Sequence, residues 1–135
     1  MIRAGWNEKG SATVEFALAL PLLMMIIFGA VEFGLGLHRQ QVITDAAREG
    51  ARAGIIMSTP RPSAGEIESV VNNYLSTAGW DPAEATVTVT GAGGASGSDL
   101  TVRVDYPSSF AMLSILAPGV PSTITLHTAT VMKLE

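Results

Sequence analysis

With 135 residues the chain is long enough for one small domain, and only 15% of its residues are charged, against roughly 25% in a typical soluble domain. Its formal net charge of −4 and the lack of a basic cluster argue against nucleic acid as a partner. Because it contains no cysteine, disulfides, thiolate zinc sites and cysteine nucleophiles are excluded.

The first predicted element is an apolar helix over residues 16–37. These 22 residues lie between Glu15 and His38, and their only ionisable group is Glu32. A helix that spans a bilayer needs about 20 predominantly apolar residues, whereas a cleaved secretory signal has an apolar core of only about 7–15. The alternative is a buried helix of a soluble protein, but so small a chain has too few apolar elements to surround it. We therefore expect a transmembrane helix in contact with the lipid bilayer.

The residues KGSATVEF, which lead into this run, resemble the processing site of type IV pilin precursors. Such precursors carry a short charged leader that ends in glycine, and a glutamate follows as the fifth residue after the cut. The resemblance implies a leader over residues 1–10, cleavage by the prepilin peptidase between Gly10 and Ser11, and an assembly role for Glu15 and Phe16. Alternatively, Glu15 only marks the membrane interface at a helix start, where a carboxylate is favourable in any case.

The helical pattern continues beyond the membrane through VITDAAREGARAGI, residues 42–55. Together with GSATVEF and the apolar run, the phrase AAREGARAG is similar to the TadE-like family, which comprises pseudopilins and minor pilins of the tight-adherence (Tad) pilus. The resemblance covers residues 10–54, and the closing ATVMKLE fits the last strand of the family's domains. We expect one N-terminal helix over residues 11–56.

Glu32 has two interpretations. Its Cα lies about 24 Å along the helix from Phe16, near the far edge of a roughly 30 Å hydrocarbon core, so its side chain is expected to reach the headgroup region. The alternative is a helix–helix or partner contact, because Ala30 and Gly34 on either side of it have the small-xxx-small spacing that permits close backbone approach.

Arg48 and Arg52 follow Asp45 and Glu49 at the i,i+3 spacing that lets opposite charges meet on a helix. A solvated helix face with local ion pairs is the expected role. The alternative is a docking surface for another pilus component.

Residues 57–135 are predicted to form a small α+β domain. Two prolines in MSTPRPSAG end the long helix. Ser63 and Glu66 then form a capping-box pattern at the start of an amphipathic helix that ends at Gly79. The apolar positions of this helix recur at helical spacing and are Ile67, Val70, Val71, Tyr74 and Leu75.

Alternating β-branched and polar residues predict three antiparallel strands within residues 84–91, 99–107 and 122–135, the third with a bulge or bend. GAGGASGSD contains G-x-G but joins two strands, so we expect a hairpin loop and not a phosphate cradle. The apolar segment 108–119 is expected to cover the core, with an exposed patch for a partner or the membrane surface as the alternative.

No constellation for catalysis is present. His38 and His127 stand alone, without the spacing of a metal site. Asp99 and Asp105 have the even spacing that places both on one strand face, where exposure to water explains them. We expect neither an enzyme nor a cofactor or metal.

The sequence thus predicts an α+β, pilin-like chain, in which a long N-terminal transmembrane helix precedes a short helix and an antiparallel sheet of about three strands. The resemblance implies a single-pass protein of the cytoplasmic membrane with an extracytoplasmic C-terminal domain, incorporated into the pilus or acting in its assembly. Its implied partners are the prepilin peptidase, other Tad pilins and membrane assembly proteins. A membrane-anchored extracytoplasmic binding module unrelated to pili is the alternative.

Overall fold

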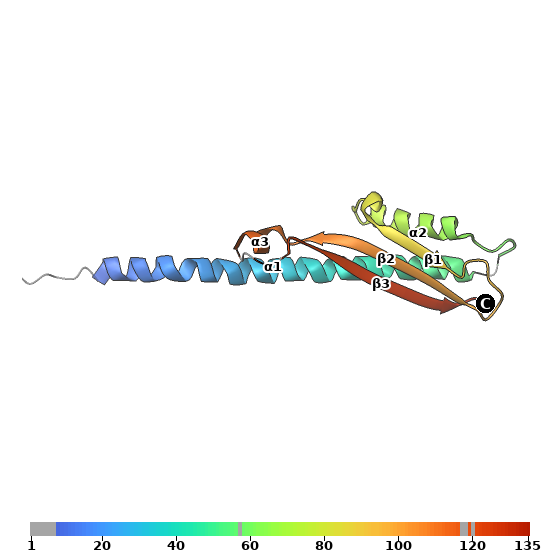
Figure 1. Cartoon of the computed structure of the whole chain (residues 1–135), viewed down its shortest axis with the longest axis horizontal. Coiled ribbons are helices and arrows are strands. Elements are labelled where there is room, and N and C mark those ends of the chain that lie inside the picture. The colour runs from blue at the N-terminus through green and yellow to red at the C-terminus, as the bar shows by residue number, and fades with distance from the viewer. Residues whose placement is uncertain (1–7, 57, 117–118, 120) are drawn as a thin grey trace, which may run out of the picture.

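The computed structural model describes residues 8–56, 58–116, 119 and 121–135. Residue 57, where the sequence predicts the domain to begin, lies outside them. In chain order the elements are α1 (Glu8–Ile55), α2 (Ala64–Thr77), the 3-10 helix η1 (Pro82–Glu84), β1 (Thr86–Thr90), β2 (Asp99–Ser109), α3 (Ala111–Leu116) and β3 (Thr123–Lys133). The three strands form one antiparallel sheet, with α1 against β2 and β3 and α2 against β1 (Figure 1). The α+β, pilin-like architecture predicted from the sequence is confirmed.

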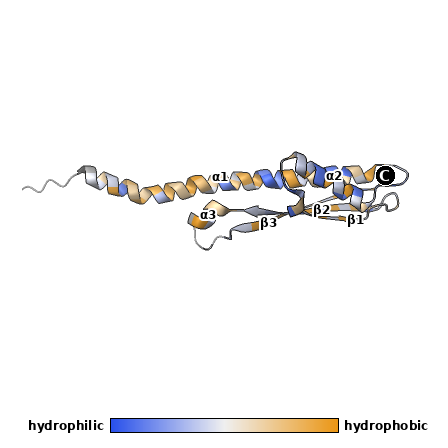
Figure 2. Ribbon diagram, turned by 90° about the horizontal axis from the view of Figure 1, so that it is seen from above, coloured by the Kyte–Doolittle hydropathy of each residue, from blue (hydrophilic) through white to orange (hydrophobic). Residues whose placement is uncertain are grey.

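Helix α1 continues through 48 residues, which corresponds to about 72 Å at 1.5 Å per residue. Its C-terminal half packs on the domain, and its N-terminal half projects beyond it (Figure 1). The projecting half is mainly hydrophobic, whereas polar residues become frequent where the domain begins (Figure 2). One helix therefore supplies both the projecting apolar segment and one side of the domain core.

Helix α2 is defined by its two ends. The Ser63 hydroxyl accepts a hydrogen bond from the Glu66 backbone N–H at 3.3 Å, and the Glu66 carboxylate accepts one from the Ser63 N–H at 2.7 Å. The predicted capping box is therefore confirmed. At the other end the backbone N–H groups of Gly79 and Trp80 donate to the carbonyls of Ser76 and Leu75. With Gly79 at φ +82°, this is a Schellman motif, which only a residue tolerant of positive φ closes easily.

The sheet has the order β1-β2-β3. Strands β2 and β3 pair residue for residue from Asp99 with Lys133 to Ser109 with Thr123, so the bulge predicted for the third strand is wrong. The hairpin predicted between the first two strands is confirmed. Its first loop residue, Gly91, has φ +84°, and a side chain there would collide with the Asp99 carbonyl.

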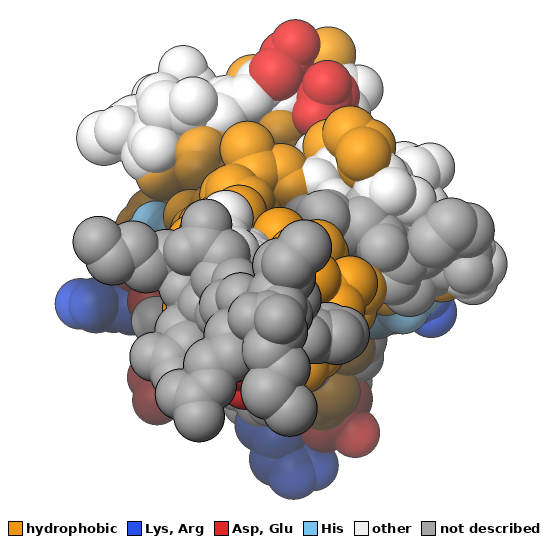
Figure 3. Space-filling view, turned by 90° about the vertical axis from the view of Figure 1, so that its left-hand side faces the viewer, with side chains coloured by type: hydrophobic (Ala, Val, Ile, Leu, Met, Phe, Trp, Pro, Cys, Tyr) orange, Lys and Arg blue, Asp and Glu red, His pale blue; other side chains and the backbone are white. Residues whose placement is uncertain are grey.

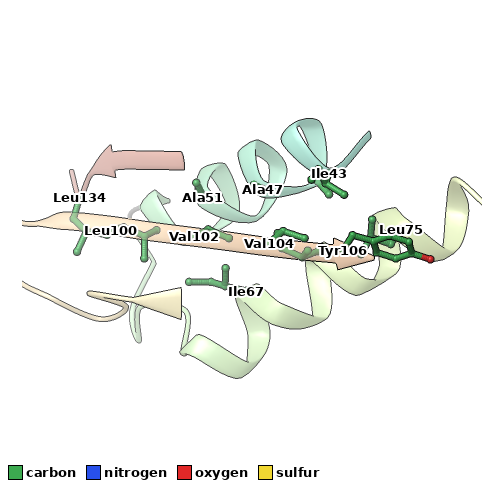
Figure 4. Packing of buried hydrophobic residues seen from close by; sticks show 12 residues of the cluster. Ile43, Ala47, Ala51, Ile67, Leu75, Leu100, Val102, Val104, Tyr106 and Leu134 are labelled. Carbon is green, nitrogen blue, oxygen red and sulfur yellow. The ribbon is translucent and has the colours of Figure 1, made fainter. Parts of the chain in front are cut away.

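The core forms where α1, α2 and β2 meet, and α1 contributes small residues to it (Figure 4). Ala46 and Ala47 are fully buried. A Cβ on Gly54 would collide with Leu100 and would lie only 2.7 Å from Ile67 Cδ1. The small residues of AAREGARAG therefore let the sheet and α2 approach the backbone of α1 closely.

Candidate assembly surface

The projecting half of α1 presents an apolar surface that the rest of the chain does not cover. Phe16, Leu18 and Ile26 are 62%, 76% and 62% exposed. None of the most apolar 18-residue window is buried, and by length and composition the helix from Gly10 to Ile55 can cross a membrane. The apolar window is therefore not buried in the way that the core helix of a soluble domain is. The N-terminal apolar helix is consistent with a single-pass membrane anchor.

The residues of the predicted processing site lie at the start of α1. Gly10 and Ser11 are in its first turns and are exposed, and residues 1–7 of the predicted leader lie outside the described residues. Glu15 and Phe16 follow and are also exposed. Because Ser11 and Glu15 are four residues apart, they share one face of the helix. A carboxylate at Glu15 is thus one turn from the amine that cleavage would create at Ser11.

Glu32 has a partner that the sequence did not suggest. Its Oε1 accepts a hydrogen bond of 2.7 Å from the backbone N–H of Met112, in the first turn of α3. Beside this contact, a Cβ on Gly36 would lie 3.4 Å from Cζ of Phe110. Ala30 is exposed, and a Cβ built on Gly34 would meet no described atom within 4 Å other than the adjacent backbone of α1. Contact of those two residues with another helix stays a prediction.

A short polar belt on α1, formed by Arg39 and Gln40, follows the apolar half and holds the end of β2 and the middle part of β3. Arg39 donates hydrogen bonds to Ser108 Oγ at 2.8 Å and to the Ser109 carbonyl at 3.2 Å. One residue further, Gln40 Nε2 donates to the His127 carbonyl at 3.0 Å. These partners lie about 70 or more residues apart in sequence, so nothing in their local pattern indicates the pairing.

Arg48 and Arg52 are both exposed, on the face of α1 opposite the buried small residues. Arg48 pairs with Asp45 at 3.4 Å, and the two side chains are 64% and 52% exposed. Among the residues described, Glu49 and Arg52 do not approach within 4 Å of each other as an ion pair. The exposure leaves both arginines accessible to a partner, and their docking role stays a prediction.

The outward face of the sheet is polar. Asp105 Oδ1 lies 2.8 Å from Nδ1 of His127 and 3.0 Å from Nε of Arg103. The hydrogen bond from His127, reinforced by Arg103, holds the pKa of the Asp105 carboxyl below its ordinary value. Asp99 pairs with Lys133 at 3.1 Å on the same face. Within the part of the chain that the structure describes, no group of three His, Asp or Glu side chains could hold a metal ion.

Among the described residues, the exposed apolar half of α1 suggests a membrane anchor, and the same helix runs on into the core of a small α+β domain. Residues 10–52 match the family described as TadE-like protein, about a third of the chain, and this confirms the resemblance to TadE-like proteins over that segment. The matched segment contains the apolar surface, the polar belt and most of the small residues that pack in the core. No curated protein and no solved structure matches the chain.

Proposed function

We propose that the protein is a TadE-like minor pilin or pseudopilin, a membrane-anchored structural or assembly component of the Tad pilus and secretion apparatus. The observation that carries the proposal is the exposed apolar half of α1, because a surface of this size requires lipid or neighbouring helices to cover it. The match of residues 10–52 to the TadE-like family supports the association with Tad pili.

The proposal places α1 across the cytoplasmic membrane, with residues 16–37 in the bilayer and the domain of residues 57–135 outside the cytoplasm. Other Tad pilins and membrane assembly proteins are its partners, and it assigns no catalytic role to the chain. The prepilin peptidase removes residues 1–10 in this scheme. Glu15 then neutralises the new amine of Ser11 or, within an assembly, the amine of a neighbouring subunit, since an unpaired charge in the membrane is costly.

The test is to co-express the full chain with its prepilin peptidase and to determine the N-terminus of the product. We expect a product that begins at Ser11. Gly10→Ile should block cleavage by filling a site that admits only a very small side chain, whereas Gly5→Ile, which alters the other leader glycine, should be cleaved normally. A mature chain that still begins at Met1 in piliated cells would refute the proposal and favour a membrane-anchored binding module unrelated to pili.

Mass spectrometry of purified pili extends the test to assembly. A processed chain that copurifies with the pilus is expected for a minor pilin. A processed chain that remains in the membrane fraction is expected for a pseudopilin of the assembly complex.

A further inference from the structure

The segment around α3 has an unusual composition and exposure. From residue 107 to residue 126 the sequence contains no Lys, Arg, His, Asp or Glu. Within this segment Met112 is 52% exposed and Ile115 is 80% exposed. The expectation that residues 108–119 cover the core is therefore wrong for these two side chains. Residues 117 and 118 of the segment lie outside the described residues.

The position of α3 is fixed against the far end of the predicted span. The bond from Met112 N–H to Glu32 and the contact of Phe110 with Gly36 hold α3 beside α1 (Figure 1). Measured from Phe16 at 1.5 Å per residue, Glu32 and Gly36 lie about 24 Å and 30 Å along the helix. The contacts of α3 therefore lie at the outer few ångströms of a roughly 30 Å hydrocarbon core.

Two charged side chains of α1 lie near α3: Glu32, at the outer end of the predicted span, and Arg39, which follows the span. Arg39, three residues after Gly36, uses its guanidinium to hold Ser108 and Ser109. Viewed along α1 from its N-terminal end, hydrophobic side chains are visible above and beside the grey residues, whereas the Lys and Arg side chains in sight lie toward the rim and acidic side chains lie at the top edge (Figure 3). The apolar side chains of α3, with charged groups beyond them, are thus suited to the boundary between acyl chains and headgroups.

We propose that α3 is a membrane-contacting element, whose Met112 and Ile115 side chains insert into the outer leaflet beside α1. The inference rests on the proposed anchoring role of α1 and goes beyond it, because it assigns a lipid surface to the folded domain. The bilayer is the occupant because the α3 surface is continuous with the exposed apolar surface of α1, which includes Val31 and Leu35 at the same level. This contact, added to the span itself, restricts the height and tilt of the domain relative to the membrane.

The absence of cysteine from the sequence makes the test direct. The full chain, with Ile115→Cys as its single cysteine, is labelled with an environment-sensitive fluorophore. It is then reconstituted at low protein density in phosphatidylcholine–phosphatidylglycerol vesicles. Two matched positions are Ile26→Cys in the span and Val131→Cys at the other end of β3, both exposed as Ile115 is. Lipids that carry a nitroxide near the headgroup or deep in the acyl chain serve as quenchers.

We expect the label at residue 115 to show blue-shifted emission and to be quenched most strongly by the shallow nitroxide. The label at residue 26 should be quenched by the deep nitroxide, and the label at residue 131 by neither. If residue 26 is quenched and residue 115 is not, the α3 proposal is wrong while the anchor stands. If residue 26 is not quenched, the anchor and the α3 proposal both fail. A signal at residue 115 that appears only at high protein density would assign α3 to contact with a second protein and overturn the lipid assignment.

Discussion

The carboxylate of Glu32 accepts a hydrogen bond from the backbone N–H of Met112, which is 80 residues away in sequence, with 2.7 Å between Oε1 and N. One hydrogen bond thereby ties the apolar half of α1 to the short helix α3. The first turn of any helix leaves backbone N–H groups without intrahelical acceptors, and a carboxylate is well suited to receive one of them. The carboxylate that looks costly within the span therefore has a structural role at its end.

The first prediction concerns this bond. Glu32→Leu should remove the acceptor and speed hydrogen exchange at the Met112 amide, because hydrogen bonds to charged groups contribute roughly 1.5–3 kcal/mol when formed. Glu32→Gln retains an acceptor oxygen and should preserve most of the protection. Equal exchange rates in the wild type and in Glu32→Leu would show that the bond does not hold α3.

The second prediction concerns the small residues of α1. Gly54→Leu should destabilise the domain by about 1–3 kcal/mol, because the new side chain collides with Leu100 and Ile67 in a packed core. The matched control is Gly34→Leu, which makes the same change on the same helix at a position where a Cβ meets no side chain within 4 Å. Denaturant unfolding in detergent micelles measures both. Similar losses in the two variants would contradict the packing role of Gly54.

The third prediction concerns the start of α2. Ser63→Ala removes the side chain that accepts the Glu66 N–H and should cost about 1 kcal/mol of unfolding free energy. Ser76→Ala, an exposed change near the other end of the helix, should alter stability by less than about 0.5 kcal/mol. Thermal unfolding of both variants is the measurement, and an unchanged midpoint for Ser63→Ala would disprove the contribution of the cap.

The fourth prediction concerns pH. Since the pKa of Asp105 is lower in the folded chain than its ordinary value of 3.8, its interactions stabilise the fold fully above that value. The contribution is lost as pH falls through the lower folded pKa. Asp105→Asn should therefore be less stable than the wild type at pH 6, and the difference should shrink in acid. In a His127→Ala background the effect of Asp105→Asn should be much smaller, and an equal effect would mean that His127 is not the main partner.

The fifth prediction concerns Glu15. Glu15→Ala and Glu15→Gln should still enter the membrane fraction, because removing a charge from the start of a span eases partitioning. Both should fail to support piliation if the carboxylate pairs with an amine during assembly. Pilus counts by electron microscopy are compared with membrane levels by immunoblot. Normal pilus numbers in these variants would leave Glu15 as a marker of the membrane interface.

The elements that local pattern determines could be predicted from the sequence. The capping box at Ser63 and Glu66, the hairpin at Gly91 and the long apolar helix each depend on residues close together in the chain. The contacts of Glu32, Arg39 and Gln40 could not be predicted, because their partners lie in strands and a helix far along the sequence.

The segment after β2 shows a second limit of local pattern. Its hydrophobic residues predict burial, and Phe110 does pack on α1, but Met112 and Ile115 are exposed. Composition alone does not distinguish a side chain that faces a core from one that faces a lipid surface, because both environments are apolar.

Helix α1 passes from its apolar half into the domain core without an intervening loop. The domain therefore cannot rotate independently of the apolar half of α1. Any rotation of the helix about its axis rotates the domain by the same angle. Each helical residue turns by about 100°, so a shift of one position in the packing of α1 against neighbouring helices would point the polar sheet face in a different direction. Under the proposed anchoring, contacts made by α1 inside the bilayer would therefore determine which side of the domain faces its neighbours.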